Sequence, residues 1–397
     1  MNVLLLTQVL PYPPDSGPKV KTWNVIKYLK SAGHTVTLVS FVRGDQAADV
    51  AYLREYCAEV HTVAIRRGPF RDGHAMLRSL ANGWPWMIVR DDRAAMRTLI
   101  DRLCAKTQFD IAHADQLNMA QYASRVRGAR KVLDAHNALW LLYKRLAQTM
   151  DRSPKRLLLE RDWRLLKVYE GHICRTFDGV LTVSEEDCAA LQEAAGRTLD
   201  MTVIPIAIDT DEVPVVERKP NADHIVHVGT MYWPPNIDAI HWFVDTVLPQ
   251  VRQRRSQVCF DCIGARPPKE LLALNENVSL GVNMAGYVAD PLLYLQQAGV
   301  MVVPVRAGGG IRVKILNGMS QGLPIVTTTI GCEGIAIEHG RHALIADTPE
   351  AFADAIVQVL GNRTLADELG RNGRQLAESK YDYRAACKPM ERVYDAI

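Results

Sequence analysis

The chain has 397 residues, of which 48% are hydrophobic and 23% charged, an ordinary globular composition that excludes a collagen-like, low-complexity or disulfide-scaffold protein. Its length is about twice what one domain usually needs, so two domains with separate cores are expected. The 47 Lys and Arg against 44 Asp and Glu leave a net charge of +3, which disfavours a protein that coats nucleic acid.

The N-terminal letters MNVLLLTQVLPYPP carry no basic region and no cleavage site, so we expect a strand there rather than a signal peptide. No stretch approaches the ~18 uninterrupted apolar residues of a membrane-spanning helix. The eight cysteines are scattered, and the one close pair, Cys259 and Cys262, lies in letters that predict a buried strand rather than half a zinc site. We therefore expect a cytoplasmic protein in a reducing compartment.

Short apolar strands alternate with amphipathic helices along the chain. The first half begins with a strand over 2–7 and a helix over 20–31. Its later strands are predicted at 34–41, 59–65, 110–115, 131–136, 179–184 and 201–208. The pattern restarts with a strand over 224–230 and a helix near 236–247. The strands that follow are predicted at 256–264, 277–288, 300–305, 323–329 and 343–347, with the last helices from Pro349.

This alternation predicts an α/β fold with two Rossmann-like, doubly wound domains that face a central cleft. The polar, proline-containing segment 210–223 suits a linker between them. We place the N-terminal domain at 1–212 and the C-terminal domain at 213–375. A last helix over 376–397 finishes the chain and can cross back to the first domain.

The strongest local signal is the segment 306–322, RAGGGIRVKILNGMSQG. A predicted strand ends there, three glycines follow, and a helical pattern begins at Ile311. Free N–H groups and the dipole at a helix start attract anions, and glycines let the backbone approach a phosphate closely. Arg312 and Lys314 lie in the predicted first turn, where positive charge opposes the dipole. A bound phosphate explains them better than the alternative, a plain tight turn with two exposed bases.

The letters NGMSQGLPIVTT at 317–328, followed by Gly331, Glu333 and Gly334, complete a pattern. This pattern resembles that of the retaining, metal-independent glycosyltransferases of family four, which have the GT-B fold. The resemblance extends over nearly the whole chain. It implies transfer of a sugar from a UDP- or GDP-type donor to an acceptor hydroxyl with retention, in cell-surface polysaccharide or glycolipid synthesis, with no metal and no further cofactor.

Two departures from the family pattern concern the donor site. The family has two Glu residues separated by seven residues, and these positions hold Gly309 and Asn317 here. Many members also have an Arg and a Lys after the first strand of the second domain, where this chain reads VGTMYWPPN at 228–236. Arg312 and Lys314 are therefore the candidates for the missing positive charge.

The resemblance also points to polar residues after strands of the first domain. The turn DSGPK at 15–19 corresponds to a family turn near the donor diphosphate, although a plain surface turn is the alternative. Asp134 and His136 end a strand at the edge where such folds bind ligands, and Asn137 lies just beyond it. A family His there contacts the sugar, and a buried His hydrogen-bonded by the backbone is the alternative. His113 and Asp115 form a second cluster of this kind. Ser184 and the acidic residues after it are interpreted as a helix cap.

The residues and the resemblance together give three groups of expected site residues. The catalytic group stabilises the leaving diphosphate or orients the donor sugar, and comprises His136, Arg312 and Lys314. The donor-binding group is Gly17, Gly229, Thr230, Tyr287, Val288, Gly308, Gly309, Gly310, Ile311 and Asn317. The acceptor-side group is Lys19, Lys21, Asp134 and Asn137.

Three alternatives remain open. A degenerate, non-catalytic scaffold or partner subunit fits Asn317 and Gly309, and a sugar-nucleotide 2-epimerase would need more acidic residues. A nicotinamide-dependent dehydrogenase is disfavoured, since neither domain opens with G-x-G-x-x-G.

Positive charge concentrates in the first domain. Residues 66–103 carry eight Arg against four Asp, and residues 140–177 carry nine Lys and Arg against four Asp and Glu. Four Trp residues lie among these charges. This composition suits a solvated face with the Trp rings packed inward, and the alternative is a peripheral contact with anionic lipid at the inner membrane face, where a lipid-linked acceptor would lie. A monomer or a dimer is expected, with no nucleic-acid partner.

Overall fold

The computed structural model describes residues 1–308 and 310–396. The chain forms two compact units, one comprising Met1–Ala207 together with the residues from Ala386 onward, the other Ile208–Ala385. The boundaries expected from the sequence were 212/213 and 375/376. The C-terminal segment thus returns to the first unit.

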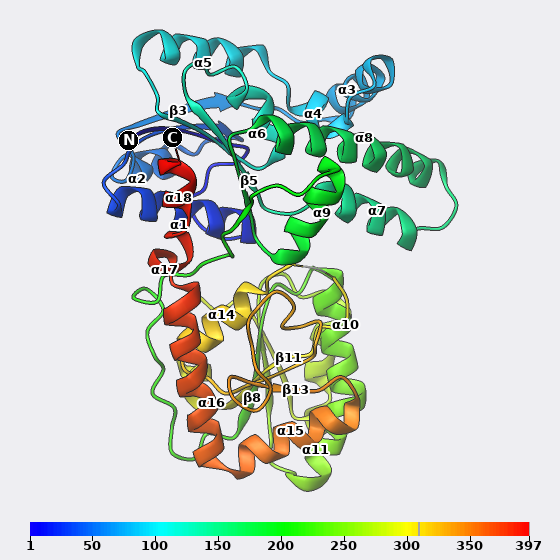
Figure 1. Ribbon diagram of the computed structural model, residues 1–397. Helices are drawn as coiled ribbons and strands as arrows, with labels where there is room; N and C mark the ends of the chain where they lie inside the picture. The colour runs from blue at the N-terminus through cyan, green and yellow to red at the C-terminus, as the bar shows by residue number, and fades with distance from the viewer. Residues whose placement is uncertain (309, 397) are drawn as a thin grey trace. The chain divides into compact units, whose positions relative to one another are not determined.

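The first unit contains a seven-stranded parallel sheet with helices around it (Figure 1). Its strands are β1 (Asn2–Thr7), β2 (Thr35–Val42), β3 (Glu59–Ala64), β4 (Ile111–Asp115), β5 (Arg130–Ala135), β6 (Gly179–Thr182) and β7 (Thr202–Val203). Its helices are α1 (Gly17–Ser31), α2 (Ala47–Leu53), α3 (Pro69–Asn82), α4 (Trp86–Asp91), α5 (Ala94–Lys106), α6 (Leu117–Ala123), α7 (Leu139–Thr149), α8 (Pro154–Thr176), α9 (Glu185–Ala195) and α18 (Met390–Asp395). The strand order β3-β2-β1-β4-β5-β6-β7 reverses between β1 and β4.

The second unit repeats this arrangement with the order β10-β9-β8-β11-β12-β13, all parallel. Its strands are β8 (His224–Val228), β9 (Phe260–Ile263), β10 (Val282–Gly286), β11 (Ala298–Val303), β12 (Ile325–Thr327) and β13 (Leu344–Ile345). Its helices are α10 (Pro234–Trp242), α11 (Leu248–Arg254), α12 (Lys269–Leu272), α13 (Leu292–Gln297), α14 (Val313–Ser320), α15 (Pro349–Gly361) and α16 (Arg363–Leu376). Shorter helical turns cover Phe243–Val247, Ala273–Glu276, Val278–Leu280 and Ala377–Tyr381, and α17 (Tyr383–Cys387) leads out of the unit. The order reverses between β8 and β11.

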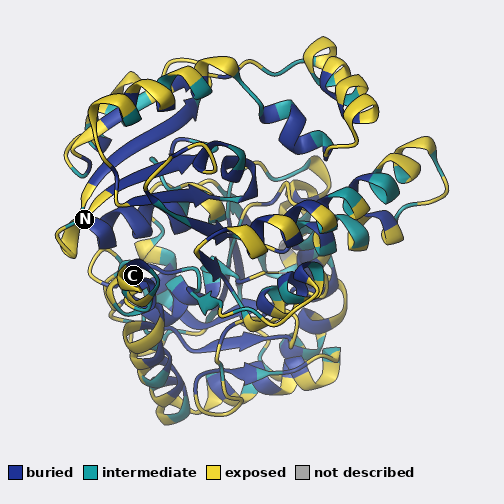
Figure 2. Cartoon of the chain, turned by 45° about the horizontal axis from the view of Figure 1, so that its top comes forward, coloured by how far each residue is buried: buried dark blue, intermediate teal, exposed yellow. Residues whose placement is uncertain are grey.

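Each unit has its own apolar core, because the central strands are buried on both faces while the helices expose their outer sides (Figure 2). Leu4, Leu6 and Phe41 contribute to the first core, and Phe260 and Phe352 to the second. The predicted doubly wound α/β fold is confirmed in both halves.

Most predicted elements have somewhat different bounds in the structure, and two of them show a physical reason. The helix expected from Val20 begins at Gly17, because Pro18 fits the first turn, where its missing N–H would be unpaired anyway. The strand expected over 201–208 is only two residues long, and Pro205, which lacks an N–H, follows shortly after its end.

Candidate donor and acceptor sites

In the second unit, polar groups gather at the carboxyl end of β8, beside the reversal of strand order where such sheets bind ligands. Gly229 and Thr230 leave the strand, and the Asn236 side-chain amide donates to the Thr230 carbonyl at 2.7 Å. Gly264, at the end of β9, lies so close to the Gly229 carbonyl that a Cβ there would overlap it. The turn after β8 is therefore held from two sides.

Lys314 brings positive charge to this turn from the first turn of α14. Its Nζ lies 3.0 Å from Asn236 Oδ1 and 3.4 Å from His227 Nε2. A Cβ at Gly229 would collide with the same ammonium group. Lys314 thus brings a positive charge to the turn after β8, where this chain lacks the Arg and Lys of many family members.

Burial, followed by the charge of Arg312, lowers the pKa of Lys314 to about 8. Burial and the Lys314 charge lower the pKa of His227 to about 3, so this imidazole is neutral. Its Nδ1 donates to the Val302 carbonyl at 2.9 Å, which leaves Nε2 as an acceptor for the lysine.

Arg312 precedes α14, which begins at Val313 rather than at the expected Ile311. Its guanidinium donates to the carbonyls of Gly310 at 2.8 Å and Gly308 at 2.9 Å. Both glycines have positive φ, 98° for Gly308 and 86° for Gly310, a conformation that favours glycine. Arg312 therefore holds the glycine turn, and burial lowers its pKa.

The other predicted donor residues have different environments. Gly309 lies outside the described residues. Ile311 is buried, and a Cβ at Gly334 would contact its side chain. Asn317 is half-buried on α14. Tyr287 is exposed after β10, and Val288 beside it is half-buried.

Arg266 was not predicted, since an isolated Arg in a loop has no sequence signal. It follows β9 with φ of 57°, the left-handed region that non-glycine residues rarely adopt. Its guanidinium lies over the ring of Tyr232, 5.4 Å from the centroid, and both Tyr232 and Trp233 are exposed. This strained residue and two aromatic rings lie beside the β8 turn.

In the first unit, Asp115 at the end of β4 is the register partner of Asp134 in β5. His136 Nε2 lies 3.0 Å from Asp115 Oδ1, and Gln116 Nε2 lies 3.5 Å from His136 Nδ1. Both contacts are satisfied when Nε2 donates to Asp115 and Nδ1 accepts from Gln116. Thr22 also donates to Asp115 Oδ1 at 2.9 Å. The predicted cluster is brought together, with Asp115 and Gln116 as additional members.

Lys21 forms a buried ion pair with Asp134. Burial alone would raise the pKa of Asp134, but the Lys21 ammonium and His113 hold it well below its usual range. Lys19 instead lies at the surface, where its Nζ is 3.0 Å from Asp15. Of the two predicted acceptor-side lysines, Lys21 already has a buried partner.

Three further features of this unit bear on the predictions. Asn137 is exposed. Gly17 begins α1 with no atom within 4 Å of a Cβ built there, so its backbone is open to approach. Ser184 caps α9 by accepting from the Asp187 N–H at 3.1 Å, which confirms the structural interpretation.

Ligand atoms of Asp115, Asp134 and His136 all lie within 4.8 Å of one another, a spacing that a metal ion could use. However, the ion pair with Lys21 already supplies a cation to Asp134. A divalent ion next to that ammonium would be repelled.

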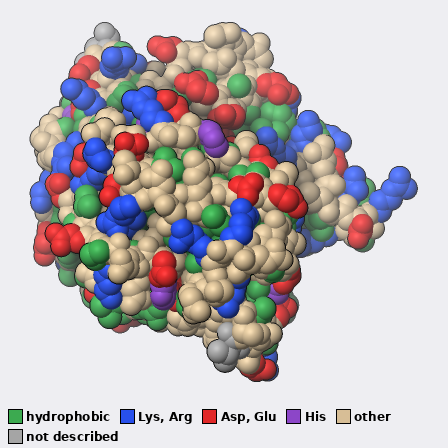
Figure 3. Space-filling model, turned by 90° about the horizontal axis from the view of Figure 1, so that it is seen from below, with side chains coloured by type: hydrophobic (Ala, Val, Ile, Leu, Met, Phe, Trp, Pro, Cys, Tyr) green, Lys and Arg blue, Asp and Glu red, His purple; other side chains and the backbone are tan. Residues whose placement is uncertain are grey.

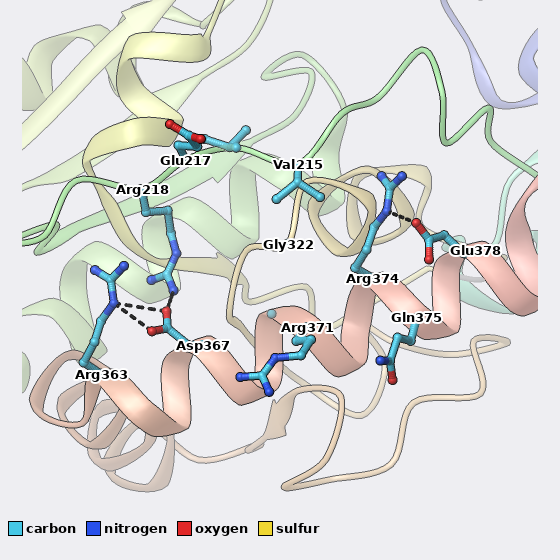
Figure 4. Close-up of a pocket in the computed structure, with 12 residues that line it drawn as sticks. Val215, Glu217, Arg218, Gly322, Arg363, Asp367, Arg371, Arg374, Gln375 and Glu378 are labelled. Carbon is cyan, nitrogen blue, oxygen red and sulfur yellow. Dashed lines mark hydrogen bonds and ion pairs between the residues drawn. The ribbon is translucent and has the colours of Figure 1, made fainter.

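A separate cavity of about 700 Å³ in the second unit lies between residues 215–218 and α16 (Figure 4). Its charges are largely paired with one another: Arg218 and Arg363 with Asp367, and Arg374 with Glu378. Arg374 also donates to three carbonyls, those of Thr210, Val213 and Ser320. These contacts fasten the segment after residue 208 to its unit, so we interpret the cavity as structural.

Two doubly wound units of this kind are the architecture of the GT-B fold. Residues 16–212 match the family described as Glycosyltransferase Family 4, and residues 222–362 match the one described as Glycosyl transferases group 1. The chain belongs to the group 1 glycosyltransferases, as its sequence motifs indicated.

Among curated relatives, a 44.6 kDa protein of the cps region of Klebsiella pneumoniae is 22% identical over 389 residues, 96% of each chain. The capsular polysaccharide biosynthesis glycosyltransferase CapM of Staphylococcus aureus is 25% identical over 128 residues, 32% of each chain. Among solved structures, Anabaena HepE in complex with UDP gives a TM-score of 0.68 at 16% identity over the whole of both chains. TarM gives 0.71 at 11% identity, covering 100% of this chain and 99% of its own. Within the described residues, no helix is long and apolar enough to cross a bilayer.

Proposed function

We propose that the chain transfers a glycosyl group from a UDP- or GDP-type sugar to an acceptor hydroxyl, with retention at the anomeric carbon. The observation that supports this most directly is the Lys314 ammonium. Its hydrogen-bond partners among the described residues are the neutral groups of Asn236 and His227. A half-buried, desolvated cation without a counter-ion is costly, and a diphosphate supplies that counter-ion. The N-terminus of α14 adds a favourable dipole.

In this proposal, the bond between the anomeric carbon and the β-phosphate oxygen breaks, and negative charge develops on the diphosphate. Lys314 and the N–H groups of the glycine turn stabilise that charge, while Arg312 holds the turn in shape. The acceptor oxygen bonds to the same face of the sugar, and its proton passes to the leaving phosphate oxygen. This route uses neither a metal nor a further cofactor.

The first unit supplies orientation in this mechanism. His136, fixed between Asp115 and Gln116, orients the donor sugar by hydrogen bonding. Asp134 is not assigned as a nucleophile, because Lys21 neutralises its charge inside the protein. Lys19, which is half-buried and paired with Asp15, and Asn137, which is exposed, are proposed to meet the acceptor.

We further propose that the acceptor is a growing cell-surface polysaccharide or a lipid-linked sugar. The Klebsiella relative comes from a cps region, and CapM is named for capsular polysaccharide biosynthesis. The identities are low, so these names support the pathway class and leave the sugar and linkage open.

The test is a panel of nucleoside diphosphates and their sugars, scored by thermal unfolding and by release of free nucleotide. A ligand at a hundredfold excess over its dissociation constant should stabilise the protein by ~2.7 kcal/mol. The variant Lys314→Met should lose this stabilisation, whereas Lys269→Met, an exposed lysine on α12, should keep it. Addition of a chelator should leave turnover unchanged.

If no nucleotide binds, the proposal fails, and the non-catalytic scaffold suggested by Asn317 takes its place. Conversion of the donor sugar without any acceptor would indicate an epimerase instead.

A further inference from the structure

Helix α3 exposes its apolar side chains and buries its small ones. The residues that it buries are Ala75 and Ser79. Phe70 is 95% exposed and Leu77 66% exposed, and Leu80 is also exposed. None of the described residues of α3 belongs to the apolar core of the first unit. The fold does not explain why this helix carries large apolar residues.

The exposed residues of α3 form an ordered pattern. The dipeptides Phe70-Arg71 and Leu77-Arg78 are seven residues apart, which is two helical turns, so each pair repeats on one side of the helix. An apolar stripe thus runs beside a basic stripe. The one acidic residue of the helix, Asp72, is half-buried. This arrangement is typical of helices that lie in a lipid interface.

The hairpin formed by α7 and α8 repeats the combination. Leu142 and Leu146 on α7 and Leu157 on α8 are exposed. Residues 139–167 carry eight Lys and Arg against three Asp and Glu. Figure 3 shows Lys and Arg side chains gathered on this projecting hairpin.

Helix α3 and the hairpin are joined within the first unit. The Arg161 guanidinium of α8 donates to Ser79 Oγ at 3.1 Å. The rings of Trp84 and Tyr169 lie 5.5 Å apart. Trp140, by contrast, is fully buried, so the tryptophans contribute less to the surface than their positions in the sequence suggest.

We propose that the outer face of α3, together with the α7–α8 hairpin, docks on an anionic lipid surface. The exposed apolar side chains run in a stripe beside Arg71 and Arg78, an arrangement that suits insertion between anionic headgroups. Each Lys or Arg near an anionic surface and each apolar side chain buried among the headgroups increases the affinity for the membrane. This inference deepens the proposed function, since a lipid-linked acceptor lies in such a surface, but its test does not need turnover.

The test is co-sedimentation of the full chain with mixed phosphatidylcholine and phosphatidylglycerol vesicles, and with phosphatidylcholine alone. The double variant Phe70→Ser/Leu77→Ser should lower the partition constant at least about tenfold, because burial of one such side chain accounts for roughly that factor. The matched control, Val215→Ser/Leu293→Ser, removes two exposed apolar side chains of the second unit and should leave binding unchanged. The variant Arg71→Glu/Arg78→Glu should weaken binding most at low salt.

The mutated side chains are mainly exposed. The variants should therefore lose vesicle binding while their thermal unfolding and their stabilisation by nucleotide stay unchanged. The proposal is overturned if the wild type binds neither vesicle at low salt, or if the control variant loses binding equally. It is also overturned if the wild type is a dimer and the double variant Phe70→Ser/Leu77→Ser is a monomer. The outer face of α3 would then be an interface between two copies of the chain.

Discussion

Lys314 shows how one long side chain can replace a charge that the sequence lacks at another position. The β8 turn has no base of its own, yet the ammonium reaches it from α14 and contacts Asn236 there. Because the half-buried side chain is desolvated, its charge is destabilised until an anion binds. The affinity for that anion is therefore expected to depend on the protonation of this single group.

This leads to a pH prediction. The pKa of Lys314 is lowered to about 8 in the ligand-free protein, and a bound diphosphate should raise it again. Binding then takes up a proton above pH 8, so the association constant should fall as the pH rises, by up to about tenfold per pH unit. Calorimetric titrations should show this slope in the wild type and a flat profile in Lys314→Met. An equal slope in both proteins would assign the proton to another group.

Gln116 provides a second prediction at this scale. Its φ of 72° and ψ of 155° lie in a region used almost solely by glycine, which costs ~1–3 kcal/mol. Its amide approaches His136, so we expect the strain to be retained for positioning that ring. Gln116→Gly should raise the free energy of unfolding by about 1 kcal/mol, after the entropy cost of glycine is subtracted, while lowering kcat. Chemical denaturation and initial rates measure the two effects. A variant with unchanged kcat would show that the strain has no role in turnover.

At the scale of elements, a row of buried polar side chains connects the C-terminal helix α18 to the sheet of the first unit. The Tyr394 hydroxyl lies 2.7 Å from His113 Nδ1, and His113 Nε2 lies 3.7 Å from Asp134. Val393 packs against Gly179, where a Cβ would collide with it. The last helix is therefore linked to the carboxylate that pairs with Lys21.

The variant Tyr394→Phe tests this link. It leaves a buried imidazole nitrogen without its hydroxyl, which should cost ~1–3 kcal/mol of unfolding free energy. Tyr169→Phe is the matched control, because the Tyr169 hydroxyl is buried with no hydrogen-bond partner in the described structure. That variant should be neutral or stabilising. Equal destabilisation by both substitutions would contradict the assignment.

Two glycines at strand–helix turns should respond differently to the same substitution. At Gly17 a Cβ meets nothing within 4 Å, whereas at Gly264 it overlaps the Gly229 carbonyl. Gly17→Ala should therefore keep the unfolding midpoint yet raise the KM for the donor, if a diphosphate approaches that backbone closely. Gly264→Ala should lower the midpoint and weaken nucleotide binding together. An unchanged KM in Gly17→Ala would remove this glycine from the donor site.

The sequence predicts elements better than it predicts contacts between them. Strand periodicity located the two sheets and the polar ends of β4, β5 and β8. It could not show that Lys21 lies buried against Asp134, since 113 residues separate them. Nor could it show the left-handed backbone of Gln116 and Arg266, which have no residue-type signature. Asn236 and His227 were also missed. Their side chains contact Lys314 of α14, which is far from both in the sequence.

For the whole molecule, the two units have separate cores, and Lys314 and the glycine turn, which are proposed to hold the diphosphate, lie in the second. A free nucleoside diphosphate should therefore protect one part of the chain first. Peptide-level hydrogen exchange with saturating UDP or GDP should slow at residues 228–236 and in α14, where the N–H groups and Lys314 meet the diphosphate. Peptides from β4 and β5 should change only when the donor carries its sugar, because His136 is assigned to the sugar. Protection of β4 and β5 by the nucleotide alone would move the diphosphate contact to the first unit and reverse the assigned roles.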